Sequence, residues 1–212
     1  MITAVIVPFH NEEQLLPDCL ESIGAVGPDL TVLVADTCSD RSELIANRWA
    51  RDRNAIVVTT SARSVGAARA AGIAAVLQTI DERKHVWLAN TDADSRVPSN
   101  WLDVQLSANV DAFAGTVEVL DWGEHSPTVS RVFRSFYERT MHVHGANLGV
   151  RADAYVEVGG FPSVPTGEDH ALWNALASHR RVFSREAPVV TSARRCGRAP
   201  HGFAGFLTAI AS

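Results

Sequence analysis

Apolar runs alternate with helix-like periodicity through the first hundred residues of the chain. Strands are predicted at 4–8, 30–35, 56–59 and 85–89, and the run at 30–35 is continuous enough to be buried on both faces. Helical spacing of apolar residues follows each run, at 15–23, 44–49, 67–77 and from Pro98 onward. Asn11 is expected to cap the first helix, and Asp40 with Glu43 resembles a capping box for the second. This alternation predicts a right-handed, doubly wound α/β sheet.

Beyond residue 110, strand-like and helix-like segments alternate less regularly. Strands are expected at 112–120, 146–150 and 187–192, and helices at 127–141 and 168–178. No repeat, linker or low-complexity stretch interrupts the chain. We therefore predict a single domain over residues 1–212, in which the second half extends the same sheet.

The composition is typical of a globular protein and argues against several other classes of protein. The chain has 212 residues, 46% of them hydrophobic, and a net charge of −5, which argues against a general nucleic-acid binder. No run approaches the ~18 apolar residues of a membrane span, and residues 2–8 lack the features of a secretory signal. The scattered Cys19, Cys38 and Cys196 fit neither a disulfide framework nor a zinc site. Reduced thiols predict a cytoplasmic protein.

Polar and acidic residues follow three of the predicted strands, at 8–13, 36–40 and 90–94. Ligands of open α/β sheets bind beyond the carboxyl ends of the strands. Carboxylates crowded on one edge repel each other unless a cation lies between them. Asp92 and Asp94, one residue apart, can aim at one point, and their hard oxygens suit Mg²⁺ or Mn²⁺ together with substrate phosphates. A solvated acidic turn is the alternative.

Two further groups allow a functional and a structural interpretation. Asp36 could accept hydrogen bonds from a ribose or a base, or it could cap a helix. Arg63, Gly66 and Arg69 open the third predicted helix, where they could favour an anion or form a solvated face.

Glu168 and Asp169 stand at the start of a predicted helix. Acidic residues there are favoured by the helix dipole, which is the structural interpretation. The functional one is a general base beside an acceptor hydroxyl. His170 is expected to be a surface histidine.

In their order along the chain, these segments resemble the family 2 glycosyltransferases, enzymes of the GT-A fold that use nucleotide-diphosphate sugars. The resemblance runs from residue 2 to about residue 192. Its segments are the opening run 5–13, the strand end 34–40, the glycine-punctuated helix from 63 to 72, the D-x-D segment 88–95, the acceptor-side stretches 145–151 and 158–162, and the E-D pair at 168–169.

The resemblance implies a role for each motif. A nucleotide-sugar would lie in a pocket formed by Pro8, Phe9, Glu12, Asp36, Arg63, Asp92 and Ala93. Asp94 would ligate Mg²⁺ or Mn²⁺, with His201 either a further ligand or a loop histidine. Asp169 or Glu168 would deprotonate the acceptor. Residues 1–98 would be the nucleotide-sugar-binding half and residues 99–212 the acceptor-side half.

The implied activity is transfer of a sugar from a UDP- or GDP-sugar to a hydroxyl, with inversion. The Q-x-x-R-W motif of processive synthases is absent after Asp169, which favours a single transfer. Thr37 stands where many members have a second aspartate, so the resemblance does not determine which residue makes one of the contacts to the nucleotide.

Arginines gather in the last third of the chain, at positions 180, 181, 185, 194, 195 and 198. They could recognise an anionic small-molecule acceptor, dock on anionic lipid headgroups at the inner face of the membrane beside a lipid-linked acceptor, or form a solvated basic face.

Three other functions are weighed. A protein of the same fold could bind a nucleotide-sugar without transferring it. A sugar-phosphate nucleotidyltransferase would show G-x-G-x-R and an early lysine, whereas the first lysine is Lys84. A Rossmann dehydrogenase would carry G-x-G-x-x-G after the first strand, which this chain lacks.

Overall fold

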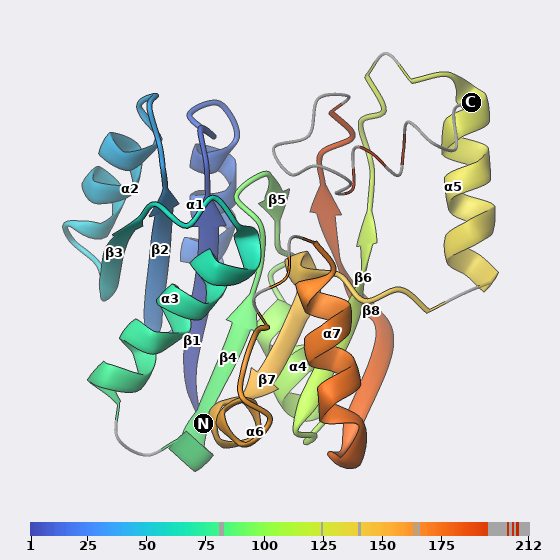
Figure 1. Cartoon of the computed structure of the whole chain (residues 1–212). Coiled ribbons are helices and arrows are strands. Elements are labelled where there is room, and N and C mark those ends of the chain that lie inside the picture. The colour runs from blue at the N-terminus through green and yellow to red at the C-terminus, as the bar shows by residue number, and fades with distance from the viewer. Residues whose placement is uncertain are drawn as a thin grey trace.

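The computed structural model describes residues 1–80, 83–123, 125–139, 141–162, 164, 166–194, 203, 205 and 207. Within this part, one mixed sheet has the strand order β3-β2-β1-β4-β7-β6-β8-β5 (Figure 1). The strands are β1 (Ile2–Phe9), β2 (Leu30–Asp36), β3 (Ala55–Thr60), β4 (Val86–Asn90), β5 (Ser95–Arg96), β6 (Ala112–Glu118), β7 (Leu148–Arg151) and β8 (Arg181–Thr191). The first four strands run parallel, and β7 lies antiparallel to both β4 and β6.

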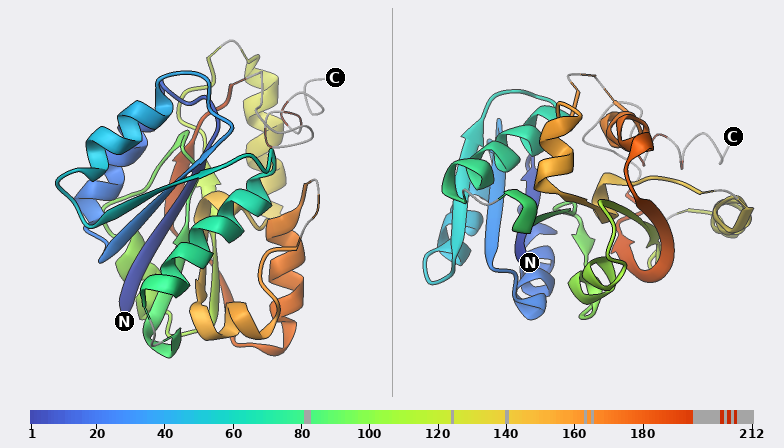
Figure 2. Two further views of the ribbon diagram at one scale, coloured as in Figure 1. Left: turned by 60° about the vertical axis from the view of Figure 1, so that its left-hand side comes forward. Right: turned by 90° about the horizontal axis from the view of Figure 1, so that it is seen from below.

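Helices cover both faces of the sheet, which confirms the predicted doubly wound α/β architecture. Their bounds are α1 (Leu16–Val26), α2 (Ser42–Ala50), α3 (Val65–Thr79), α4 (Trp101–Ser107), α5 (Pro127–Arg139), α6 (Ala152–Glu157) and α7 (Glu168–Ala175). α1, α2 and α4 pack on one face, and α3, α6 and α7 pack on the other (Figure 2). α5 stands beyond the edge of these layers.

The alternation of side chains along β1 explains the two cores. Ala4 and Ile6 point toward α3, whereas Val5, Val7 and Phe9 point toward α1. All five are buried, as expected for a central parallel strand.

Two predicted helix starts are wrong. α1 begins at Leu16, because Asn11 has a left-handed backbone (φ 53°) and its Oδ1 accepts hydrogen bonds from the N–H groups of Ser39 and Asp40. α2 begins at Ser42, and Asp40 accepts from the Ser42 N–H at 2.9 Å without being the capping residue. Both side chains tie the loop after β1 to the loop after β2.

The second half also differs in detail from the prediction. β8 begins at Arg181 rather than at residue 187, and the short α6 was not expected. The extra strand length pairs with β6 in parallel, across a shift of register between Gly115 and Val117. Periodicity missed this segment because its side chains are only partly buried.

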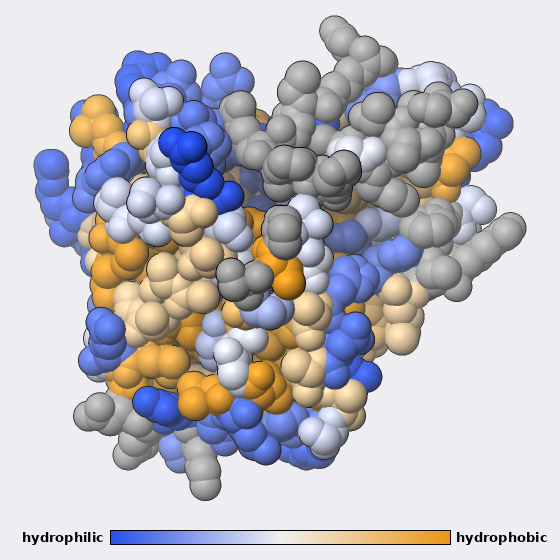
Figure 3. Space-filling model, viewed as in Figure 1, coloured by the Kyte–Doolittle hydropathy of each residue, from blue (hydrophilic) through white to orange (hydrophobic). Residues whose placement is uncertain are grey.

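The described arginines of the last third do not form one surface. Arg180 and Arg181 lie at the start of β8, Arg185 lies within it, and Arg194 lies beyond its end, roughly 30 Å of strand from the start. Figure 3 shows apolar surface over the alanine-rich α3 and hydrophilic side chains around the loops above it. No helix in the described part of the chain is both long and apolar enough to cross a bilayer.

Gly72 lets α3 approach the sheet closely. A Cβ at Gly72 would lie 2.8 Å from the Cγ2 methyl groups of Ile6 and Val34, whereas a Cβ at Gly24 in α1 would lie 3.8 Å from Trp49. We predict that Gly72→Ala lowers the free energy of unfolding by about 1–2 kcal/mol through overpacking. The matched Gly24→Ala should raise it by about 0.5–1 kcal/mol through helix propensity. Urea denaturation measures both, and equal effects would contradict this packing.

Candidate active site

A cleft of about 550 Å³ opens at the carboxyl ends of β1, β2 and β4. Its lining includes every predicted site residue that the structure describes: Pro8, Phe9, Glu12, Asp36, Arg63, Asp92, Ala93, Asp94, Glu168 and Asp169. His201 lies outside the described residues. The convergence of Asp36 and Asp94 in one cleft is what the strand ends predicted.

Three residues in the loops after β1, β2 and β3 have strained backbones, and two of them, Thr37 and Arg63, line the cleft. Asn11, Thr37 and Arg63 have φ values of 53°, 55° and 50°, in a region that side chains other than glycine rarely adopt. Such strain costs on the order of 1 kcal/mol or more each, and it concentrates at functional sites. The loops after β1, β2 and β3 therefore hold their side chains in enforced positions.

Asp36 organises the rim through its backbone partners. Its two carboxylate oxygens accept hydrogen bonds from the N–H groups of Arg63 and Ser64, each at 3.0 Å. Thr37 Oγ1 donates to the same carboxylate at 3.1 Å. Asp36 thus fixes the loop that leads into α3 and presents Arg63 to the cleft.

The buried guanidinium of Arg69 joins two acidic groups from distant parts of the chain. Arg69 Nη2 contacts Asp92 Oδ1 at 2.5 Å, and Arg69 Nη1 pairs with Glu168 Oε1. Burial alone would lower the pKa of Arg69, but Asp92 and Glu168 more than offset it and raise that pKa. The cation is therefore permanent, and it links the D-x-D loop to α7.

Two glycines make room for this bridge. A Cβ at Gly66 would lie 2.9 Å from the Glu168 side chain, and a Cβ at Gly145 would clash with the Arg69 guanidinium. The sequence pattern places Gly66 in a helix start that could favour an anion. The structure adds a steric reason for a glycine there, because a larger residue would contact the Glu168 side chain too closely.

The two acids at the start of α7 differ in their surroundings. Glu168 is buried and paired with Arg69; burial raises its pKa while Arg69 opposes that rise. Asp169 Oδ2 accepts from the Gly145 N–H at 2.9 Å, and Oδ1 accepts from the His170 N–H at 2.8 Å. Asp169 is thus held at the cleft wall by backbone groups.

His144 forms the wall beside Asp169. Its Nε2 shares a hydrogen bond of 2.7 Å with Tyr137 Oη, and the two rings stack at 5.4 Å between centroids. Burial lowers the pKa of His144 to about 4, against a smaller opposing effect of Asp169. His144 is therefore neutral at pH 7.

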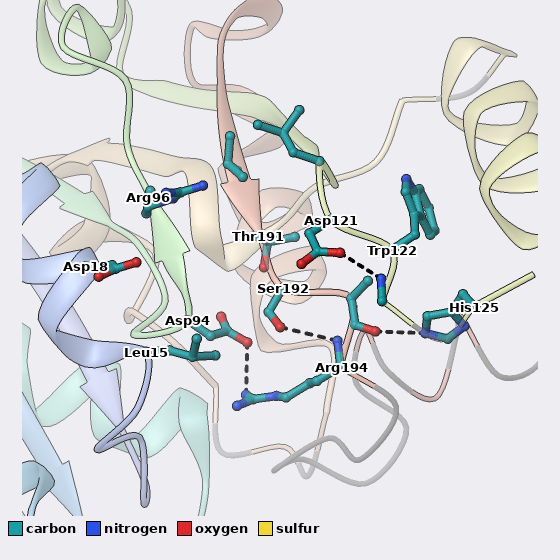
Figure 4. A pocket seen from close by; sticks show the side chains of 14 residues that line it. Leu15, Asp18, Asp94, Arg96, Asp121, Trp122, His125, Thr191, Ser192 and Arg194 are labelled. Atoms are coloured by element: carbon teal, nitrogen blue, oxygen red, sulfur yellow. Dashed lines mark hydrogen bonds and ion pairs between the residues drawn. The ribbon is translucent and has the colours of Figure 1, made fainter. Parts of the chain in front are cut away.

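Asp94 lies in the most acidic part of the cleft. Burial raises its pKa to about 6, although Arg194 opposes this; Asp92 and Glu12 add to the rise. Arg194 Nη2 contacts Asp94 Oδ2 at 2.9 Å, and Arg194 Nη1 contacts Glu12 Oε1 at 2.5 Å. Figure 4 shows Arg194 reaching Asp94 from the segment that follows β8.

These carboxylates fit a divalent cation that is shared with a substrate. Asp94, Asp92 and Glu12 bring hard oxygen donors and negative charge to one place. Among the described residues, no group of three or more His, Cys, Asp or Glu side chains could hold a metal by itself. Mg²⁺ commonly takes one or two carboxylates and completes its shell with phosphates and water.

Arg69, His144 and Arg194 also line the cleft and are not assigned to the site from the sequence. From the sequence, Arg69 and Arg194 belong only to basic groups of residues. The ion pairs of Arg69 and Arg194 join residues 23 to 182 positions apart in the sequence, which local patterns do not report.

The family model of glycosyl transferase family 2 matches residues 4–155. The chain belongs to this family. The match begins in β1 and ends in α6, so it includes the D-x-D loop but not α7. No curated protein matches the chain.

Solved structures share the fold at low sequence identity. A Staphylococcus aureus TarS fragment (residues 1–349) in complex with UDP-GlcNAc is 16% identical, with a TM-score of 0.70, over 93% of this chain and 60% of that one. The glucosyl-3-phosphoglycerate synthase of Mycobacterium tuberculosis, with Mn²⁺, UDP-glucose and phosphoglyceric acid, is 12% identical, with a TM-score of 0.62, over 99% of this chain and 75% of that one.

A third structure belongs to another class of enzyme. The 4-diphosphocytidyl-2C-methyl-D-erythritol synthase is 13% identical, with a TM-score of 0.54, over 99% of each chain. The chain thus spans about three fifths of the TarS fragment and nearly all of this smaller enzyme.

Removing Arg69 should destabilise the protein strongly. We predict that Arg69→Met lowers the free energy of unfolding by about 3–5 kcal/mol, because Glu168 is left as a buried charge without its partner. The double variant Arg69→Met/Glu168→Gln should recover much of this loss. Urea denaturation of the single and double variants measures the coupling, and fully additive losses would contradict the bridge.

The low pKa of His144 predicts a pH dependence of stability. Because its pKa is about 4 in the fold and about 6.5 in the unfolded chain, its contribution is complete above pH 6.5 and is lost as the pH falls toward 4. Between pH 7 and pH 4.5, His144→Gln should lose about 2 kcal/mol less stability than the wild type. Denaturation at both pH values tests this, with His85→Gln as the control for replacing a histidine. Parallel losses in wild type and His144→Gln would refute it.

Proposed function

We propose that the protein is a glycosyltransferase that moves a sugar from a UDP-sugar to an acceptor hydroxyl in a metal-dependent, inverting and non-processive reaction. The observation that carries the proposal is the convergence of acidic strand ends on Asp94 in one cleft. UDP is favoured as the nucleotide because the TarS fragment and the mycobacterial synthase were solved with UDP-sugars. We place the activity in the cytoplasm.

The donor is proposed to lie along the β1, β2 and α3 side of the cleft. Pro8, Phe9 and Glu12 line the end of β1 there, and Asp36 holds the loop that presents Arg63. In this arrangement Arg63 faces the nucleotide base or its phosphates. Asp92 and Ala93, with the backbone they fix, lie against the ribose and the sugar.

Asp94, with Asp92 and Glu12 nearby, is the proposed position of Mg²⁺ or Mn²⁺. When bound, the cation neutralises the charge that grows on the leaving diphosphate. Arg69 keeps Asp92 in place through their ion pair, so mutual repulsion does not push the carboxylates of the site apart.

Asp169 is the proposed general base, and Glu168 supports it by binding Arg69. The acceptor oxygen attacks the anomeric carbon from the side opposite the diphosphate; the new C–O bond forms as the bond to the phosphate oxygen breaks. The acceptor proton passes to Asp169, and the nucleoside diphosphate leaves. Asp169 suits this role because backbone N–H groups, rather than a buried guanidinium, hold its carboxylate.

The acceptor is proposed to enter beside His144 and Asp169, on the side formed by residues 99–212. A small anionic molecule is one candidate, by analogy with the phosphoglyceric acid of the mycobacterial complex. A lipid-linked hydroxyl, reached by peripheral contact with the membrane, is the other.

A thermal-shift panel tests the donor class. UDP-, GDP- and dTDP-sugars are compared, each with and without Mn²⁺. Binding raises the melting temperature by mass action, and a shift specific to UDP-sugars with Mn²⁺ supports the proposal. CTP belongs in the panel because of the fold shared with the diphosphocytidyl synthase. A shift with CTP alone would favour a nucleotidyltransferase instead.

Substitution of Asp94 separates the cation site from the fold. We predict that Asp94→Asn abolishes the Mn²⁺-dependent part of UDP-sugar binding while the protein still unfolds cooperatively. Isothermal titration calorimetry measures the affinity, and Asp103→Asn, on the exposed face of α4, is the matched control. Unchanged Mn²⁺-dependent affinity in Asp94→Asn would remove Asp94 as the ligand.

Substitution of Asp169 tests the base. Asp169→Asn should lower the rate of UDP release about 10²–10⁴-fold and leave donor affinity unchanged, because a general base acts only in the reaction step. A variant with full turnover would exclude Asp169 from this role. Donor binding without any turnover in the wild type, across varied acceptors, would instead indicate a non-catalytic binding protein.

A further inference from the structure

Arg194 forms ion pairs with two acidic residues of the cleft, Glu12 and Asp94. Its guanidinium lies between Glu12 and Asp94, with side chains that are 6% and 13% exposed, and contacts both at 2.5 and 2.9 Å. Each carboxylate thereby shares a positive neighbour that comes from the far end of the sequence. A dication on Asp94 would need the same carboxylate oxygens and would repel the guanidinium.

Arg194 also forms part of the wall between two cavities. A second cavity of about 500 Å³ lies beside the cleft, and only Asp94, Thr191 and Arg194 line both in the described part of the chain. Figure 4 shows this second cavity, with Asp18 and Asp121 among the side chains around it. A guanidinium that leaves Asp94 thus has space and negative charge on the other side of the wall.

The backbone beside Arg194 is anchored, so its side chain is the part that can move. Ala193 O bonds with His125 Nε2 at 2.7 Å, and the Arg194 N–H donates to Ser192 Oγ at 3.2 Å. These contacts hold the segment after β8 whether or not the guanidinium reaches Asp94. Rotation of the side chain alone would carry its charge from one cavity toward the other.

We propose that Arg194 is an internal counter-cation that competes with the dication for Asp94 and so sets the metal affinity of the cleft. Without a dication, its guanidinium neutralises Glu12 and Asp94. When a dication binds Asp94, the guanidinium moves into the second cavity toward Asp18 and Asp121. This inference rests on the dication site of the proposed function, and it adds a residue that weakens that site.

Binding of Mn²⁺ to the protein, without any sugar donor, tests the competition. The free Mn²⁺ signal in electron paramagnetic resonance gives the dissociation constant, measured with and without UDP. Arg194→Gln removes the competing charge, so it should bind Mn²⁺ at least about tenfold more tightly than the wild type. Arg48→Gln, at an exposed position of α2 that lines neither cavity, removes a positive charge elsewhere and should stay within about twofold.

Stability provides a second readout that is independent of activity. In metal-free buffer Arg194→Gln should melt several degrees below the wild type, because Glu12 and Asp94 lose their shared cation. Saturating Mn²⁺ should raise its melting temperature more than that of the wild type. If Arg194→Gln does not fold, Arg194→Lys replaces it: a single ammonium cannot span both carboxylates, so its Mn²⁺ affinity should also exceed that of the wild type.

Several outcomes would overturn the inference. An unchanged or weaker Mn²⁺ affinity in both variants would show that Arg194 does not compete. Absence of Mn²⁺ binding in every protein, with and without UDP, would remove the competitor altogether. The transfer of the sugar is tested separately, since turnover of UDP-sugars without a dication would support the transfer and contradict only its proposed metal dependence.

Discussion

The ion bridge made by Arg69 holds the two sides of the cleft together. Its guanidinium, buried under the sheet edge, meets Asp92 from the loop after β4 and Glu168 from α7. Arg69 and Glu168 are both buried, so the loss of either one would leave the other as an unpaired charge in a medium of low polarity. The positions of Asp92 and Asp169, one on each side of the cleft, therefore depend on this one side chain.

Negative charge is the second constraint on the cleft. Parallel strands end at one edge of the sheet, which brings together Glu12, Asp36, Asp92 and Asp94. Each of these carboxylates needs its own hydrogen-bond donors or cation. Backbone N–H groups satisfy Asp36, Arg69 satisfies Asp92, and Arg194 bridges Glu12 and Asp94. Burial, Asp92 and Glu12 raise the pKa of Asp94 despite its contact with Arg194, so an added cation would stabilise the charged form of this acid.

The sequence was sufficient for the architecture and for most of the cleft lining. Continuous apolar runs identify buried strands, and strand ends in a parallel sheet lie together by topology, so Asp36 and Asp94 could be placed in one cleft. Helix starts were harder to predict, because Asn11 bonds to the loop after β2, and Asp40 accepts from the loop after β1 as well as from the first residue of α2. The sequence could not predict the cationic partners of these acids. Arg69 has the pattern of an ordinary helix residue, and Arg194 is one of many late arginines; only the fold pairs each of them with specific acids. The division into donor and acceptor halves stays a proposal, as do the roles of the individual site residues.

The most direct measurement is the anomalous scattering of Mn²⁺ in crystals of the protein grown with UDP. The account predicts one strong peak in contact with the Asp94 carboxylate and the UDP diphosphate, with the nucleotide along the ends of β1 and β2. A peak remote from Asp94, or UDP bound outside this cleft, would contradict it.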